Sequence, residues 1–335
     1  MLAQGDDNKF LLKISSSPHV KHEDTVTSIM LDVIIALVPA LVWSIYVFGF
    51  RPLTLTLVSV VSCVLFELIF CLILKKPISI GDLSAVVTGI LLAFGLPPAS
   101  PLWTPIVGAA FAIIIVKMLF GGIGKNVVNP AIAGRVFLFI SCAPFVGRYT
   151  EPFEKLSPFA MNPPEIITHP DILSSATPLA QLKQGLLPEQ TIFDMILGNI
   201  AGCIGEISAL LLIAGGIYLI FRKVITWHIP VTMIGITALL TYLFSRNLLS
   251  ANFMLAELFS GGLIIGAIYM ATDYSTSPLN NNGKLIYGIG CGAITVFIRY
   301  FGSYPEGVSF AILIMNLLVW YIDKLTKPKK FGGTV

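Results

Sequence analysis

A short polar run, Asp171-Ile172-Leu173-Ser174-Ser175-Ala176-Thr177, lies in the longest loop between the apolar stretches of this chain. Thr177 offers a hydroxyl group that an enzyme can esterify. Ser175 and Ala176 are small neighbours that let such an enzyme close over the loop, and the acidic Asp171 lies six positions upstream of Thr177. Residue types in this order are typical of a covalent attachment site.

The same segment is also typical of a helix start, with Thr177 as the N-cap and Pro178 at the first helical position. The two interpretations are compatible. A helix start presents free backbone N–H groups and a partial positive charge, both of which favour a phosphate. A phosphate ester on Thr177 would therefore be held electrostatically as well as covalently.

A second candidate site lies in the glycine- and asparagine-rich run from Gly121 to Arg135. Glycines in this run allow close backbone approach or turns, while Asn126 and Asn129 offer side-chain amides for hydrogen bonds. Arg135 falls inside an apolar stretch, where an arginine is costly and marks a functional or a paired position. Two interpretations stay open: a re-entrant turn in which Arg135 pairs with a neighbouring carboxylate, or a functional site.

Acidic residues within or beside apolar stretches form the third set of candidates: Asp32, Glu67, Glu206, Glu257 and Asp273. Acids in membrane spans commonly line ion paths. Glu206 and Glu257 fall inside expected spans and are the better candidates for contact with a translocated Na⁺ or H⁺. Asp273 lies near an expected helix end, where a capping role is an equal alternative.

The composition places these residues in a membrane protein. Hydrophobic residues make up 56% of the chain and charged residues only 12%, against about 45–50% and about 25% in soluble domains. The net charge of +3 is too small to indicate a nucleic-acid partner. The five cysteines are scattered singly, so no disulfide framework and no metal site is predicted.

A transmembrane helix needs about 20 mainly apolar residues, and by that measure we expect an all-α integral membrane protein with about ten transmembrane helices. They fall near 28–49, 53–74, 82–96, 102–120, 128–145, 193–221, 229–246, 252–272, 284–301 and 307–326. Lys and Arg concentrate in the segments that share a side with the N-terminus. The positive-inside rule therefore places both termini in the cytoplasm and the Thr177 loop on the outer face.

The chain accordingly divides into five parts: a cytoplasmic N-terminal segment (1–25), a first helical group (26–145), an outward-facing loop (146–190), a second helical group (191–326) and a cytoplasmic tail (327–335). Each group has about five spans, an odd number, so a duplicated half must be inverted relative to its twin. Thr88-Gly89 and Gly261-Gly262 echo each other weakly, with chance alignment of glycines as the alternative. We predict two inverted five-helix repeats.

Four stretches together resemble one known family: Thr88-Gly89 through Pro97-Pro98 with Pro101-Leu102-Trp103, Phe120-Gly121 through Asn129-Pro130 to Arg135, Asp171 through Thr177, and Ala271-Thr272-Asp273. The family contains the D subunit of the Rnf complex, an ion-translocating ferredoxin:NAD⁺ oxidoreductase, and the B subunit of the Na⁺-translocating NADH:quinone oxidoreductase. The run 171–177 resembles the Asp-x-x-(Ser/Thr)-(Gly/Ser)-Ala-Thr sequence on which a flavin transferase joins FMN to threonine. The resemblance covers nearly the whole chain from about residue 25 onward.

The B subunit of the quinone-reducing enzyme carries a longer N-terminal extension, whereas about 25 polar residues precede the first expected helix here. This difference favours the Rnf type and argues against a quinone site.

The resemblance implies FMN bound covalently to Thr177, with Asp171 helping the flavin transferase to recognise the loop. It also implies a second, noncovalent flavin such as riboflavin, or an ion path, near Asn126, Asn129 and Arg135. We therefore expect a subunit of a multi-subunit redox complex in a bacterial or archaeal cell membrane. It would relay electrons between partner subunits, couple that transfer to Na⁺ or H⁺ translocation, and contact membrane lipids. Alone it would not be a complete enzyme.

The alternative comes from a different class of protein. Inverted five-helix repeats also build solute channels and secondary transporters, and such a protein would carry no flavin.

Overall fold

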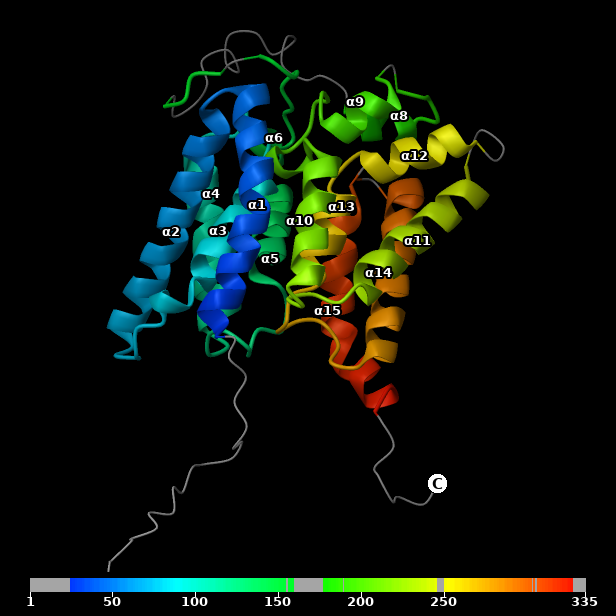
Figure 1. Ribbon diagram of the computed structural model, residues 1–335. Coiled ribbons are helices and arrows are strands. Elements are labelled where there is room, and N and C mark those ends of the chain that lie inside the picture. The colour runs from blue at the N-terminus through cyan, green and yellow to red at the C-terminus, as the bar shows by residue number, and fades with distance from the viewer. Residues whose placement is uncertain are drawn as a thin grey trace, which may run out of the picture.

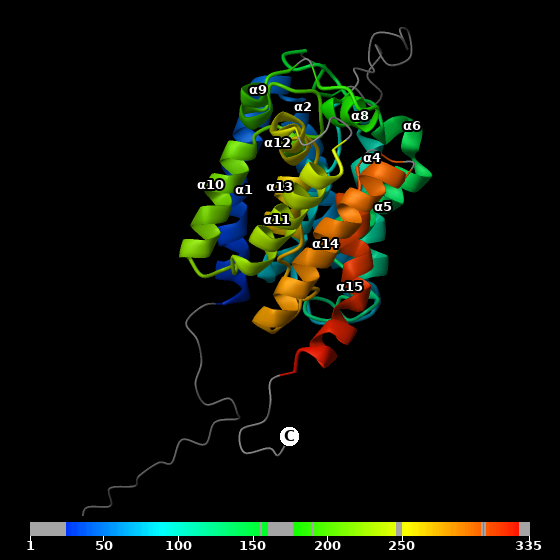
Figure 2. The same cartoon turned by 90° about the vertical axis from the view of Figure 1, so that its right-hand side faces the viewer.

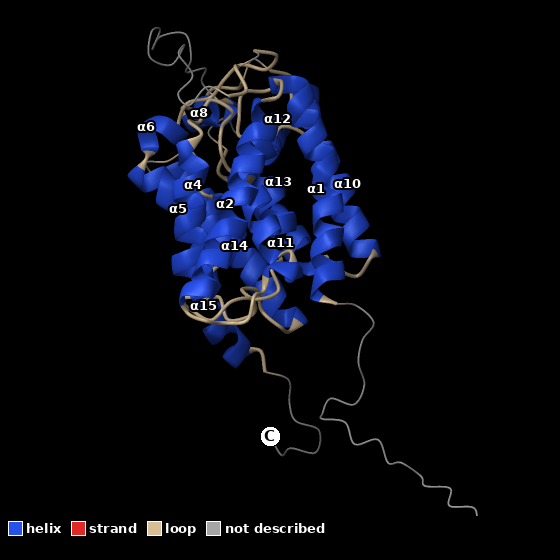
Figure 3. Cartoon of the chain, turned by 90° about the vertical axis from the view of Figure 1, so that its left-hand side faces the viewer, coloured by secondary structure: helices blue, strands red, loops and turns tan. Residues whose placement is uncertain are grey.

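The computed structural model describes residues 25–154, 156–159, 177–188, 190–245, 250–302, 304 and 306–327. Every regular element within these residues is a helix (Figure 3). The expected all-α class is confirmed.

The first half of the chain forms the following helices: α1 (Val26–Phe48), α2 (Arg51–Ile73), the 3₁₀ turn η1 (Ile80–Asp82), α3 (Ser84–Phe94), α4 (Trp103–Ala110), the π-helical η2 (Phe111–Met118), α5 (Pro130–Ser141) and α6 (Ala143–Val146). Local sequence explains where they start. Thr25 forms a capping box with Ser28 before α1, and Asn129 caps α5 with Pro130 at its first position.

The second half forms these helices: α8 (Pro178–Lys183), α9 (Ile192–Leu197), the 3₁₀ turn η3 (Ile204–Glu206), α10 (Ala209–Phe221), α11 (His228–Leu243), α12 (Ala251–Phe259), α13 (Leu263–Ile265), the π-helical η4 (Gly266–Met270), α14 (Asn281–Phe301) and α15 (Val308–Leu325). Ser208 and Ser250 cap α10 and α12.

Four of the described helices are long and apolar enough to cross a membrane: Val26–Phe48, Arg51–Ile73, Asn281–Phe301 and Val308–Leu325. A fifth span is present if Ala251–Phe259 and Leu263–Met270, which meet at a bend of 65°, form one broken helix. Shorter apolar helices occupy the other expected positions. Large apolar side chains such as Leu65, Ile69 and Phe297 point outward, as lipid contact requires. The protein is an integral membrane protein, and the count of ten complete crossings stays a prediction.

The prediction of one helix over 193–221 is wrong, because α9, η3 and α10 occupy this segment. α9 ends at Gly198, whose φ of 93° is left-handed and stops the helix. The chain then runs through η3 before Ser208 starts α10. Glu206 consequently lies in a buried turn and not inside a transmembrane helix.

The two halves pack together as one body. The largest apolar core combines Leu37 and Ile132 of the first half with Ile264 and Ile312 of the second. α1 and α10 lie side by side in each view (Figures 1 and 2). The start of α1 and the end of α15 lie at one end of the bundle, and α8, α9 and α12 lie at the opposite end (Figure 1).

Candidate functional site

Thr177 lies directly before α8, at the end of the bundle opposite the two described chain ends (Figure 1). Its Oγ1 accepts a hydrogen bond from the backbone N–H of Ala180 at 3.3 Å, so the expected N-cap is present. The side chain is half-buried, and α8 packs on α12. Asp171, Ser175 and Ala176 fall outside the described residues.

An open cavity lies toward the other end of the bundle, with about 80 Å³ of space that the centre of a water-sized sphere can occupy. Its walls come from the first turns of α1 and α3, the start of α5, the end of α10 and η4. Asn126 and Asn129 both line this cavity, whereas Arg135 does not.

The two asparagines differ in their hydrogen bonds. The Asn129 side chain is fully engaged: its Oδ1 accepts from the N–H groups of Ala131 at 3.0 Å and Ile132 at 3.3 Å, and its Nδ2 donates to the carbonyl of Met270 at 3.1 Å. Asn126 is also buried, but within the described part of the chain its Oδ1 has no hydrogen-bond partner. The Asn126 Oδ1 is therefore available to accept a hydrogen bond from a ligand.

Asp273 lines the same cavity and accepts hydrogen bonds from Ser275 Oγ at 2.9 Å and Thr276 Oγ1 at 3.0 Å. Burial raises the pKa of Asp273 above its ordinary value, against those hydrogen bonds.

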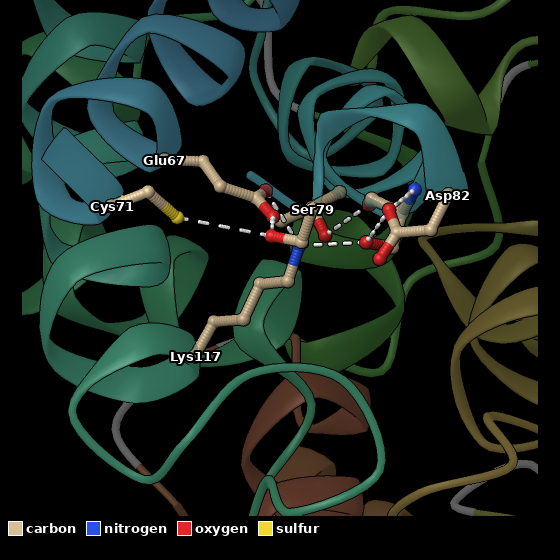
Figure 4. Close-up of polar contacts among 7 residues, drawn as sticks. Glu67, Cys71, Ser79, Asp82 and Lys117 are labelled. Atoms are coloured by element: carbon tan, nitrogen blue, oxygen red, sulfur yellow. Dashed lines mark hydrogen bonds and ion pairs between the residues drawn. The ribbon is translucent and has the colours of Figure 1, made fainter. Parts of the chain in front are cut away.

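A buried ionic network adjoins the cavity (Figure 4), and of its members only Glu67 was among the predicted candidates. Lys117 Nζ donates to Glu67 Oε2 at 2.7 Å and to Ser84 Oγ at 2.6 Å. Ser84 Oγ donates onward to Asp82 Oδ1 at 2.5 Å, and Ser79 Oγ donates to Glu67 Oε1 at 2.5 Å. The sequence signal was a lysine inside an apolar run, which by its cost indicates a paired or functional position.

Arg135 lies deeper in the protein, in a cluster with two acids. Its Nη2 donates to Glu306 Oε2 at 2.6 Å and to Glu206 Oε1 at 3.2 Å. The Arg135 side chain is only 5% exposed, so the charges of this cluster are shielded from water. Of the two interpretations left open for Arg135, the pairing with a carboxylate is present. Glu306 escaped prediction because it lies in the short connection before α15, outside every expected span.

Interrupted helices meet around this cluster. α3 ends at Gly95, where an added Cβ would come within 2.7 Å of Arg135 Cδ. The break between α12 and α13 places Gly262 so that a Cβ would meet Glu306 Oε1 at 2.7 Å. The negative end of α3 therefore faces the guanidinium, and the positive start of the 263–270 helix faces the carboxylates. Ends of broken helices at a repeat interface are typical of ion and substrate sites in membrane proteins.

Glu257, the other predicted ion-path residue, has a cation of its own. Arg299 Nη1 donates to Glu257 Oε2 at 2.6 Å and to the Glu257 carbonyl at 2.7 Å. Both side chains are almost fully buried. Glu206 and Glu257 thus pair with two different arginines, Arg135 and Arg299.

Fold and sites define the class of this protein. It is a helical membrane protein that holds charges at the interior ends of broken helices and has, near one end, a mainly apolar cavity with a few polar groups in its wall. Residues 13–332 match the model of the NQR2, RnfD, RnfE family, and the chain belongs to this family.

Its relatives align over almost their entire length. A chain from Acetobacterium woodii, named as the D subunit of a Na⁺-translocating ferredoxin:NAD⁺ oxidoreductase complex, is 43% identical over 98% of this chain and 97% of its own length. A chain from Clostridium ljungdahlii, named for a proton-translocating complex of the same type, is 39% identical over 99% of both chains. The D subunit of the ion-translocating oxidoreductase complex of Escherichia coli K12 is 33% identical over 96% of this chain and 99% of its own length.

Proposed function

We propose that this chain is the D subunit of an ion-translocating ferredoxin:NAD⁺ oxidoreductase complex, in which it carries covalently bound FMN and relays electrons between partner subunits. The observation that carries the proposal is the family match over residues 13–332. The position of Thr177 at the start of α8, at one end of the bundle, supports it. Two relatives named as D subunits differ in the ion of their complex, Na⁺ in one and protons in the other. Either ion remains open for this chain on family grounds.

The geometry at Thr177 fits a phosphate ester. The hydroxyl lies at the start of α8, and the Ala180 N–H already points at Oγ1. Esterification replaces the hydroxyl hydrogen and leaves the acceptor oxygen in place, so the cap and the ester are compatible. A flavin transferase would need access to Thr177, and the position of α8 at the end of the bundle supports such access.

We extend the proposal to a second, noncovalent flavin such as riboflavin, bound at the cavity beside Asn126. The buried and unpartnered Asn126 Oδ1 can accept from an N–H or O–H of a ring system, and Lys117 brings a positive charge to the wall. Arg135 belongs to the ion-pair cluster, and we do not include it in this site.

A bound flavin supplies the one- and two-electron redox chemistry, while the protein contributes position, a dry environment and nearby charge. Chemistry on ferredoxin and NAD would belong to other subunits. We place the protein in a bacterial or archaeal cell membrane, in contact with lipids, with cytoplasmic termini and the Thr177 loop outside.

The test is in-gel flavin fluorescence of the protein purified from cells that contain the transferase. We expect a fluorescent band in the wild type, and a Thr177 peptide heavier by one FMN less one water. Thr177→Ala should give a dark band. Thr191→Ala is the matched control, because Thr191 caps the neighbouring α9 in the same way and should leave the fluorescence unchanged.

A dark wild-type band with an unmodified Thr177 peptide would overturn the carrier proposal and favour a solute channel or secondary transporter of the same fold.

A further inference from the structure

The Arg135 cluster differs in charge balance from the other two fully buried ion-pair sites that the structure describes. Lys117 faces Glu67, and Arg299 faces Glu257, so each has one cation and one carboxylate. Arg135 faces both Glu206 and Glu306. With both acids ionised, the cluster holds one uncompensated negative charge away from water, a costly state.

Glu306 leaves part of its hydrogen-bonding capacity unused. Its Oε2 accepts from Arg135, whereas its Oε1 makes no hydrogen bond of normal geometry within the described residues. The Gly262 backbone N–H lies near the carboxyl group and, like Arg135 and Arg299, favours its charged form. Glu306 is 9% exposed, and Ser309, 6% exposed, has a hydroxyl that is also without a partner. Both residues line one small cavity between α5 and α15.

That cavity is built for something smaller than a flavin or a solute. It leaves about 10 Å³ for the centre of a water-sized sphere, which is the space of about one water molecule. Phe139 and Phe310 also line this cavity and make part of its wall apolar. Such a space suits a proton that arrives through a transient water.

We propose that Glu306 is a proton-exchange site of this protein, with Oε1 as the atom that gains and loses the proton. Uptake converts the Glu306 carboxylate into a carboxylic acid and leaves Arg135 balanced by Glu206. Release restores the carboxylate, and no electron is gained or lost in either step. Proton exchange at Glu306 follows from the cluster itself, whereas a role of this proton in ion translocation rests on the proposed function.

The surroundings support a proton that moves near neutrality. Burial, with Glu206 adding to it and Arg135 opposing it, raises the pKa of Glu306 to about 7. The charged and titratable groups that face Glu306 are Arg135 of α5, Glu206 of η3, Arg299 of α14, and Cys203 and Tyr149 from the connecting segments.

The experiment is infrared difference spectroscopy of the intact complex in K⁺ buffers from about pH 5 to about pH 9, which follows the C=O band of a protonated carboxyl group. We expect a band that disappears as the pH rises through neutrality. It should be absent in Glu306→Gln and retained in Glu257→Gln, whose acid has a cation of its own. Ser309→Ala should keep the band but shift its midpoint, because the cavity loses a hydroxyl.

A band that persists unchanged in Glu306→Gln would overturn the proposal, as would its absence from the wild type. If Na⁺ in place of K⁺ abolished the band at fixed pH, the site would take a metal cation and the proton assignment would be wrong. Should Glu306→Gln fail to assemble, a pH midpoint of the carboxyl band that is unshifted in Ser309→Ala would overturn the proposal. A gel band without flavin fluorescence would overturn the proposed function but would not change the expected titration of Glu306.

Discussion

Arg135 Nη2 lies 2.6 Å from Glu306 Oε2, although 171 residues separate the two in sequence. Arg135 belongs to the first group of helices and Glu306 to the second, so their ion pair spans the seam between the halves. Glu206, from η3 of the second half, joins it at 3.2 Å. A change of charge at this point therefore acts on both halves.

The stability of the protein should depend on pH through Glu306. The folded state raises the pKa of Glu306 from 4.5 to about 7, so it holds the proton more tightly than the unfolded state does. Its contribution to stability is complete below about pH 4.5 and is lost as the pH rises through about 7. We expect the wild-type Tm to fall across this window and the Tm of Glu306→Gln to fall less. Equal slopes in both proteins would contradict this assignment.

Gly262→Ala should disturb the Arg135 cluster. The new Cβ would come within 2.7 Å of Glu306 Oε1 and 3.2 Å of Arg135 Nη1, so the ion pair must shift. We expect a loss of about 1–3 kcal/mol, the usual cost of overpacking, measured by chemical or thermal unfolding in detergent. Gly235→Ala in α11 is the control, since a Cβ there meets nothing within 4 Å, and it should be neutral or slightly stabilising.

Lys117→Met should be among the most damaging single changes. It leaves Glu67, which is 0% exposed, as an uncompensated buried charge. The expected cost is about 3–5 kcal/mol. Removing both charges in Lys117→Met/Glu67→Leu should recover most of that loss, and a double variant no more stable than Lys117→Met would refute the pairing argument. Lys324→Met, at an exposed position, should stay within about 0.5 kcal/mol of the wild type.

The two cavity asparagines should separate stability from ligand binding. Asn129→Ala removes the cap of α5 and should cost about 0.5–2 kcal/mol in unfolding. Asn126→Ala should leave unfolding nearly unchanged and weaken the noncovalent flavin up to about tenfold, the value of one hydrogen bond. Flavin released on denaturation, counted against the flavin that stays on Thr177, measures the second effect. Equal flavin retention in both variants would place the ligand elsewhere.

Local signals in the sequence were sufficient for the class of fold and for the positions of the helices. Long apolar runs predict helices because a lipid-exposed backbone must satisfy its own hydrogen bonds, and each expected segment contains an apolar helix. Thr177 before Pro178 predicts the observed N-cap, because capping depends on adjacent residues. The break at Gly198 was missed, since a glycine in an apolar run is also tolerated inside transmembrane helices.

Only the tertiary structure decided which charges meet. The partners of Lys117 and Arg135 lie 50 and 171 residues away, and nothing in the spacing of charges along the chain selects Glu67 or Glu306. The structure likewise assigned Asn129 to a helix cap and left Asn126 facing the cavity, although both are asparagines in the same short run. The physical reason is common to these cases: removal from water makes an unpaired polar group costly, and the packing of the two halves determines which partner is within reach.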